Sequence, residues 1–131
     1  MKKIKVCGMK YHENISQISL LKPDFIGFIF YVKSKRFIDN ESILPVDKNI
    51  KRTGVFVNAS VDHIFKKLNQ YQLDYVQLHG DEDPGICDRL TREEIPVIKA
   101  FSIGERFNWK SIDAFKDKCK YFLFDAAGKN H

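Results

Sequence analysis

Short runs of β-branched and aromatic residues alternate along the chain with longer segments in which apolar positions recur at helical spacing. This alternation is typical of βα units and of a parallel sheet. The ends of the short runs recur about every 21–27 residues, the length of one strand, one helix and two short loops. The pattern predicts six strands, over residues 4–7, 25–30, 53–57, 75–78, 96–100 and 121–124.

The segments between these runs predict helices. Ser60 is a suitable N-cap, and the residues after it form an apolar stripe at i, i+3, i+4 and i+7. Pro45 interrupts the segment 39–49, where we expect an irregular connection with at most one helical turn after Asn40. The apolar stripes are Val61, Ile64, Phe65 and Leu68; Ile86, Cys87 and Leu90 after Asp81 or Asp83; Trp109, Ile112, Phe115 and Cys119; and the shorter Ile15, Ile18 and Leu21.

Composition places the chain among globular proteins. Its 131 residues, 44% of them hydrophobic, suffice for one domain with a packed core. The longest apolar stretch, 25–32, is far below the roughly 20 residues of a membrane helix, and no secretory signal precedes it, so we expect a cytoplasmic protein without a membrane segment. Three cysteines without CxxC spacing suggest neither a disulfide scaffold nor structural zinc. The net charge of +5 contains no basic block, which disfavours nucleic acid as a partner.

Candidate chemistry lies at the carboxyl ends of the predicted strands, where parallel α/β folds collect reactive side chains. A thiol such as Cys7 accepts a proton or acts as a nucleophile beside a cation, but the residue is equally suited to a small buried hydrophobic position. Asp125 directly follows an apolar run, which suits a general acid or a cap for the next segment. The predicted strand ends and the loops after them present Cys7, Arg36, Asn58, Gln77, His79, Lys99 and Asp125.

Arg36 and His79 each have two interpretations. Arg36, in the basic loop 33–36, holds a carboxylate or phosphate by paired hydrogen bonds, or is a solvated surface charge. His79 binds polar groups of a substrate or pairs with Asp81. A metal site at His79 and residues 81–83 is disfavoured, because consecutive acids point in different directions. Neither GxGxxG nor GxxxxGK[ST] occurs, which disfavours nucleotide binding of those types.

Length alone favours an open sheet, because a closed barrel of eight units takes about 250 residues. One alternative is therefore a noncatalytic binding or assembly module with a flavodoxin-like sheet. Another is a phosphosugar isomerase or aldolase on a barrel-like scaffold, with Lys99 as the candidate for a Schiff base.

Four short motifs, in order and separated by one or two repeats of about 22 residues, resemble the phosphoribosylanthranilate isomerases of tryptophan biosynthesis, which are compact (βα)8 barrels. The resemblance implies an Amadori rearrangement of N-(5-phosphoribosyl)anthranilate to 1-(2-carboxyphenylamino)-1-deoxyribulose 5-phosphate. That reaction needs one acid and one base, and no metal or redox cofactor. The motifs are residues 5–8, 54–58 and 77–80, and Phe124 and Asp125 with Gly128.

The same resemblance implies roles for individual residues. Asp125 protonates the furanose ring oxygen, and Cys7, as a thiolate, removes the proton from C2 of the ribose. Arg36 approaches the anthranilate carboxylate, and His79 with Gln77 belongs to the substrate-binding wall. The partner is therefore an anionic phosphosugar-anthranilate substrate.

The chain also departs from the family pattern. Met9 and Lys10 stand where Thr or Arg often closes the first motif, and Lys35 replaces the usual Pro before Arg36. The Gly-rich stretch after Asp125 and the last two to three βα units are missing. We therefore expect a single domain over residues 1–131, an incomplete barrel of about six strands and five connections. Its exposed sheet edges favour self-association, and we expect little turnover from the chain alone.

Overall fold

Six parallel strands form one sheet in the part of the chain that the computed structural model describes, residues 1–39 and 46–127. Their order across the sheet is their order along the chain, from β1 at one edge to β6 at the other. The elements are β1 (Lys5–Val6), α1 (His12–Leu20), β2 (Phe25–Ile29), β3 (Lys51–Phe56), α2 (Val61–Tyr71), β4 (Tyr75–Leu78), α3 (Pro84–Arg92), β5 (Val97–Ile103), η1 (Trp109–Phe115) and β6 (Tyr121–Ala126).

The strand order decides between the two sheet architectures. A flavodoxin-like sheet has the order 2-1-3-4-5, with its first strand inside the sheet. Here each strand pairs in parallel with the next one along the chain, as in a (βα)8 barrel. The flavodoxin-like alternative is therefore wrong, and the prediction of parallel βα repeats of the TIM-barrel type is confirmed.

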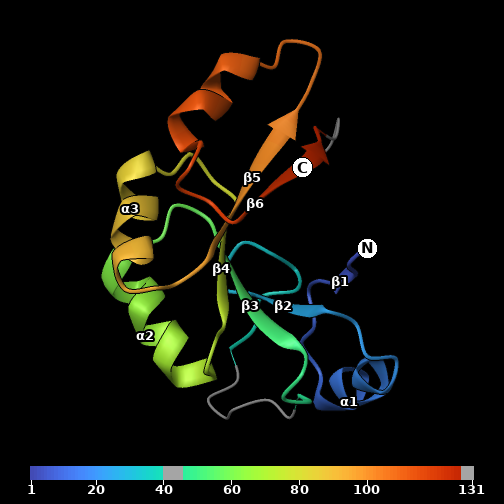
Figure 1. Cartoon of the computed structure of the whole chain (residues 1–131). Coiled ribbons are helices and arrows are strands. Elements are labelled where there is room, and N and C mark those ends of the chain that lie inside the picture. Colours follow the sequence, from blue (N-terminus) through green and yellow to red (C-terminus); the bar gives the residue numbers. More distant parts are fainter. Residues whose placement is uncertain (40–45, 128–131) are drawn as a thin grey trace.

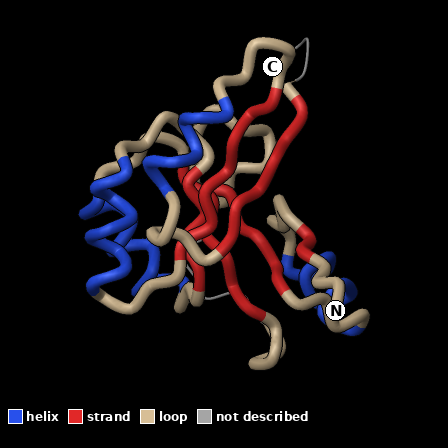
Figure 2. The backbone as a smooth tube through the Cα atoms, turned by 45° about the horizontal axis from the view of Figure 1, so that its top comes forward, coloured by secondary structure: helices blue, strands red, loops and turns tan. Residues whose placement is uncertain are grey.

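The sheet curls into part of a barrel. Lys3 Nζ, just before β1, donates a hydrogen bond of 3.0 Å to the hydroxyl of Tyr121 on β6, although 118 residues separate the two. Helices α2 and α3 lie together on one side of the sheet, whereas α1 lies near β1 (Figures 1 and 2). The first and last strands thus face an open side, and both ends of the chain lie there (Figure 1).

The two faces of the curled sheet carry different cores. On the concave face, the Phe25 ring packs edge-on against Tyr75 and Tyr121, with centroids 5.1 and 6.1 Å apart. On the convex face, Phe30 stacks on Phe56 and contacts Tyr71 of α2. Because side chains alternate between faces along a strand, the aromatic contacts assign every strand position to one face or the other.

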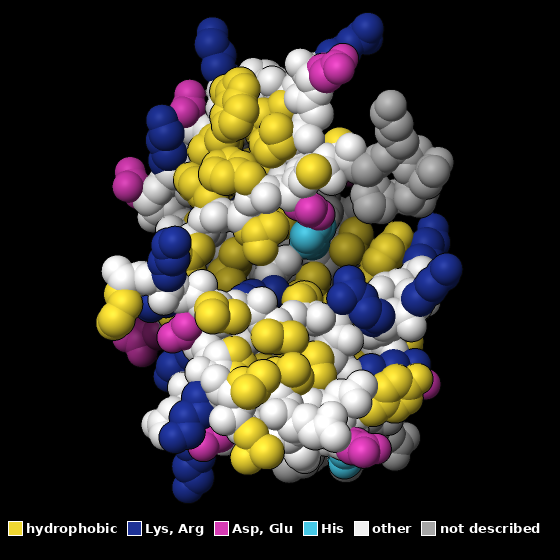
Figure 3. Space-filling view, turned by 90° about the vertical axis from the view of Figure 1, so that its right-hand side faces the viewer, with side chains coloured by type: hydrophobic (Ala, Val, Ile, Leu, Met, Phe, Trp, Pro, Cys, Tyr) yellow, Lys and Arg dark blue, Asp and Glu magenta, His cyan; other side chains and the backbone are white. Residues whose placement is uncertain are grey.

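Hydrophobic side chains are exposed on the open side. Trp109 and Phe124, whose rings are 6.1 Å apart, are 62% and 53% exposed. Figure 3 shows this side of the molecule: hydrophobic side chains gather above and below a hollow, where a histidine lies next to an acidic side chain. In a complete barrel, further βα units cover such positions.

The six predicted strands are all present, five of them with shifted ends, and the predicted N-cap Ser60 accepts a hydrogen bond from the backbone N–H of His63. Asp83, rather than Asp81, caps α3. Strand β1 has two residues, and both pair with β2. Asn40, Pro45 and Gly128 lie outside the described residues.

Two details of the predicted helices are wrong. The segment after Asn108 is a 3₁₀ helix that ends at Phe115, so Cys119 lies beyond it. Leu21 is the C-cap of α1 and is 79% exposed rather than part of a buried stripe. In the described ranges, no helix has both the length and the apolar character needed to cross a membrane.

Candidate active site

Three predicted residues form a polar line across the concave face. Gln77 and His79 lie two residues apart along β4 and its end, and the Gln77 side-chain amide is 2.8 Å from His79 Nδ1. On its other side the same ring approaches β6, with Nε2 3.4 Å from Asp125 Oδ2. With the amide donating to Nδ1, the ring proton sits on Nε2 and points at the carboxylate. The partner of His79 is therefore Asp125 and not Asp81.

Cys7 lies at the opposite edge of the same concave face. Its Sγ covers Gly27, where a Cβ atom would come within 2.7 Å of the sulfur. Gly27 shares its face of β2 with Phe25, two residues earlier. Phe25 packs on Tyr121, which shares its face of β6 with Asp125. The thiol and the carboxylate therefore belong to one curved surface at the carboxyl ends of β1 and β6.

The ammonium group of Lys5 lies near the Cys7 thiol. The Lys5 ammonium is 3.2 Å from the point where a Gly27 Cβ would stand, so Lys5 and Cys7 converge over one glycine. Only a residue without a side chain leaves room for both, and we attribute the glycine at this strand position to that need. The sequence pattern did not mark Lys5 as a candidate, although its spacing from Cys7 by two residues already places both side chains on one face.

Arg36 contacts the same segment. Its guanidinium donates to the carbonyl oxygen of Cys7 at 3.2 Å. The side chain also lies across Gly8, which has φ +78° and would bring a Cβ within 2.7 Å of Arg36 Cδ. Gly8, in the left-handed backbone conformation, thus turns the chain directly after Cys7. Because it has no side chain, the Arg36 side chain packs against this turn. Arg36 is exposed at the mouth of the curled sheet.

Lys99 does not lie on this surface. It pairs in register with Phe122 rather than with Leu123, and so points to the convex face. There its ammonium donates to Glu82 Oε1 at 3.0 Å and to the carbonyl of Gly80 at 2.6 Å. The side chains of Glu82 and Lys99 are 0% and 4% exposed. The expectation that Lys99 joins the other strand-end residues on one face is therefore wrong.

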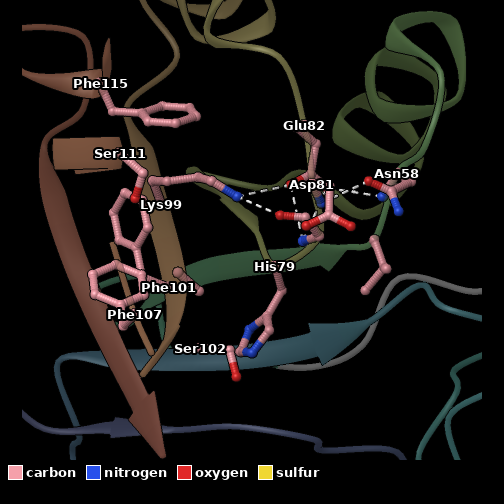
Figure 4. Close-up of a pocket in the computed structure, with 13 residues that line it drawn as sticks. Asn58, His79, Asp81, Glu82, Lys99, Phe101, Ser102, Phe107, Ser111 and Phe115 are labelled. Atoms are coloured by element: carbon pink, nitrogen blue, oxygen red, sulfur yellow. Dashed lines mark hydrogen bonds and ion pairs between the residues drawn. The ribbon is translucent and has the colours of Figure 1, made fainter. Parts of the chain in front are cut away.

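Glu82 holds the two loops that follow β3 and β4. Its carboxylate accepts backbone N–H bonds from Asn58 at 2.8 Å and from Gly80 at 2.9 Å, as well as the bond from Lys99. The Asn58 side chain in turn accepts from the backbone N–H of Asp81 at 2.8 Å. Figure 4 shows these contacts joining the two loops above His79. This buried clamp was not predicted from the sequence.

A cavity of about 550 Å³ opens between the clamp and η1. The clamp residues line one wall, and Phe101, Phe107 and Phe115 line the other (Figure 4). His79 and Ser102 lie at its edge toward the concave face. The cavity thus combines an apolar wall with a few polar groups at the carboxyl ends of β4 and β5, a common arrangement for small-molecule binding.

The site therefore brings a thiol, a carboxylate, an imidazole and a guanidinium to the carboxyl ends of parallel strands. These groups suit proton transfer to and from a small anionic substrate. In residues 1–39 and 46–127, no three His, Cys, Asp or Glu side chains are placed to hold a metal ion together.

The curled parallel sheet, with polar side chains gathered at its carboxyl edge, defines a protein of the TIM-barrel class. The model of the N-(5'-phosphoribosyl)anthranilate (PRA) isomerase family matches residues 4–130, so the chain belongs to this family.

Curated relatives agree with the family model. The chain is 39% identical over 132 residues to the N-(5'-phosphoribosyl)anthranilate isomerase of Parabacteroides distasonis, covering 93% of this chain and 58% of the relative. It is 38% identical over 134 residues to that of Thermoanaerobacter sp., covering 99% of this chain and 64% of the relative. The chain thus spans roughly three fifths of the length of these relatives.

Solved structures of the family match the fold. The isomerase of Thermus thermophilus superposes with a TM-score of 0.83 at 24% identity, over 98% of this chain and 64% of that one. A second isomerase structure, in complex with reduced 1-(o-carboxyphenylamino)-1-deoxyribulose 5-phosphate, has a TM-score of 0.75 at 30% identity, over 98% of this chain and 77% of that one.

Proposed function

We propose that this chain, within a complete barrel, isomerises N-(5-phosphoribosyl)anthranilate to 1-(2-carboxyphenylamino)-1-deoxyribulose 5-phosphate in tryptophan biosynthesis. The observation that carries the proposal is the placement of Cys7 and Asp125 on one concave surface, at the carboxyl ends of β1 and β6. Family membership and the ligand held by the related structure support it.

Asp125 is the proposed general acid. In its protonated form it gives a proton to the furanose ring oxygen, the C1–O bond breaks, and the substrate opens to a Schiff base. His79 Nε2 faces the same carboxyl group and is itself held by Gln77. We assign His79 and Gln77 to orienting Asp125 and the sugar hydroxyls.

Cys7 is the proposed general base. As a thiolate it takes the proton from C2, and the electron pair of the broken C–H bond moves toward the imine to give an enolamine. Tautomerisation of the enolamine gives the ketone product. The Lys5 ammonium lies on the same glycine as the sulfur and provides a positive neighbour for the thiolate.

Arg36 is the proposed contact for the anthranilate carboxylate. Only one of its donors is used by the Cys7 carbonyl, at 3.2 Å, and the guanidinium lies at the mouth beside the base. A planar fork of donors suits a carboxylate. The reaction as written uses no metal and no redox cofactor.

The aldolase alternative is less consistent with the site. A lysine that forms a Schiff base must be free and unprotonated to attack a carbonyl. Lys99 instead forms a buried ion pair with Glu82 on the convex face. We therefore retain the isomerase proposal.

Isomerase activity is tested with the chain alone and with the chain joined to the C-terminal segment of the P. distasonis relative. We expect little or no turnover from the 131 residues and clear turnover from the completed chain, because the open side lacks the strands that close the barrel. Fluorescence of the anthranilate group follows the reaction. Full activity of the short chain would contradict the incomplete barrel, and a folded but inactive completed chain would contradict the isomerase proposal.

We also propose that residues 1–131 form one domain, a partial barrel that lacks the last two to three βα units, and that it resides in the cytoplasm, where phosphorylated biosynthetic sugars are processed. Its open edges provide unpaired backbone groups along β1 and β6, and exposed apolar residues lie beside β6. Such edges pair readily with another chain.

Self-association of the isolated chain is therefore expected. The average mass measured by sedimentation should rise with concentration, and Phe124→Lys should lower the association because a charge replaces an exposed ring on β6. Leu21→Lys, at an even more exposed position at the end of α1, is the control and should leave the mass unchanged. A monomer at every concentration would rule out the proposal.

A further inference from the structure

We propose that Cys87 and Cys119 form a reversible disulfide that ties α3 to the start of β6. Cys87 lies in the middle of α3, and Cys119 lies two residues before β6. Their sulfur atoms are 3.8 Å apart, in direct contact, although 32 residues separate them along the chain. The proposal does not depend on the isomerase reaction.

The two segments are held together independently of the sulfurs. Lys118 Nζ forms an ion pair of 2.9 Å with Asp88 on α3. The hydroxyl of Thr91, one turn after Cys87, lies 3.3 Å from the carbonyl oxygen of Lys118. These contacts hold the residues next to the two cysteines together, which keeps the thiols adjacent.

The two thiols differ in a way that suits sequential reaction. Cys87 is buried, whereas Cys119 is half-buried and lines a surface groove of about 450 Å³ with Thr91, Lys118 and Lys120. The Cys119 thiol donates a hydrogen bond to the Cys87 sulfur, so the two sulfur atoms already face one another. Because Cys119 is the more accessible sulfur, a reagent reaches it first, and Cys87, in contact with it, attacks in the second step.

The oxidant that we propose is a small external disulfide of the glutathione class. Cys119 loses its proton to solvent and attacks one sulfur of the reagent, which forms a mixed disulfide and releases one thiolate. The Cys87 thiolate then attacks Cys119 Sγ, which forms the internal disulfide and releases the second thiolate. The protein dithiol loses two electrons and two protons, and the external disulfide becomes two thiols.

The consequence concerns the strand that carries Asp125. Strand β6 is an edge strand, paired only with β5 in the described residues. A covalent link just before its first residue restrains the 32-residue segment that contains β5 and η1 and fixes the start of β6 against α3. Oxidation should therefore slow amide hydrogen exchange at the beginning of β6 and raise the urea midpoint, and a reducing dithiol should reverse both.

The test treats the folded chain with glutathione disulfide and follows intact mass and tryptic peptides. We expect the loss of two hydrogen atoms and a linked peptide pair containing Cys87 and Cys119. Cys87→Ser should stop at a glutathione adduct on Cys119, and Cys119→Ser should leave Cys87 unmodified. Cys7→Ser should not change the link.

Two results would overturn the proposal. One is a stable glutathione adduct at Cys119 in the unaltered chain, with no link to Cys87. The other is a link that appears only after urea is added, because the pairing would then belong to the unfolded chain. Cys87→Ala, which removes the thiol without adding a hydroxyl to the core, gives a second variant should Cys87→Ser fold poorly.

Discussion

Glu82→Gln should lower the free energy of unfolding of this chain by about 3–5 kcal/mol, the cost of breaking one side of a buried ion pair. Both carboxylate oxygens of Glu82 accept hydrogen bonds, one from Lys99 and Gly80 and the other from Asn58 and Gly80. A glutamine side chain keeps only one of the two oxygen atoms. Its NH₂ group would face hydrogen-bond donors and could not accept from them. The substitution therefore leaves the Lys99 ammonium buried without its counter-charge.

Urea unfolding measures this effect, and the chain provides a matched control. Lys116 and Asp113 form an ion pair of 2.7 Å with both side chains exposed, so Lys116→Met should leave the urea midpoint unchanged. Lys99→Met should also destabilise the chain, because the Gly80 carbonyl loses its donor. The Glu82→Gln and Lys99→Met double variant should lose less than the sum of the two single variants. Equal midpoints for Glu82→Gln and Lys116→Met would contradict the buried clamp.

The strand pattern was predictable because each strand is a local property of the sequence. The run 75–78 has hydrophobic residues at every strand position but Gln77, and it forms β4 without change. Strand β5 continues to Ile103, three residues beyond its predicted end, because β6 pairs with it as far as Ala126. Local composition therefore shows where a strand lies, whereas pairing with another strand sets where it ends.

The 3₁₀ helix after Asn108 shows a second limit. Trp109, Ile112 and Phe115 are spaced by three residues, which fits both a 3₁₀ helix and one face of an α-helix. The structure buries Phe115 against Phe101 and leaves Trp109 exposed, so only one end of the stripe is in the core. The sequence does not contain the packing that decides between the two helix types.

The polar line from Gln77 through His79 to Asp125 was only partly predictable. Residues two apart on a strand share a face, so Gln77 and His79 belong together on local grounds. Asp125 is on β6, with β5 between it and β4. The ring of His79 reaches across because the sheet curls and because β5 presents the small side chain of Ser102, in register with Asp125, to the concave face.

The buried partner of Lys99 had no local signal. Glu82 stands among acids in the run 81–83, which reads as the start of a helix, and Asp83 does cap α3. The contact that buries Glu82 comes from a lysine 17 residues later on β5. Because successive side chains along a strand point to opposite faces, Lys99 and Ile98 must lie on different faces, and Lys99 points away from the concave one.

Asp125→Asn and Cys7→Ser should each reduce kcat of the completed barrel by about 10²–10⁴-fold, the usual contribution of a positioned acid or base. Asparagine keeps the shape of Asp125 and its approach to His79, but it has no carboxyl proton to give to the ring oxygen. Serine keeps the position of Cys7 over Gly27, but its hydroxyl does not ionise near neutral pH and so does not take the proton from C2.

Affinity for the reduced product analogue separates chemistry from folding. Both variants should bind it within a few-fold of the unaltered chain, because Arg36 and the rest of the surface are intact. Arg36→Met should show the opposite behaviour, with weaker binding and a smaller effect on kcat, since the guanidinium is proposed to hold the carboxylate rather than to move a proton. Cys119→Ser, which changes a thiol before the amino end of β6 rather than at its carboxyl end, should retain the activity of the completed chain.

The two proton-transfer variants also test the order of events. If Asp125 opens the ring before Cys7 removes the C2 proton, substrate deuterated at C2 should react more slowly than ordinary substrate in Cys7→Ser. The same comparison should show a smaller difference in Asp125→Asn, because ring opening then limits the rate. Near-normal turnover in either variant would mean that another group performs its step, and the assignment of that residue as acid or base would be wrong.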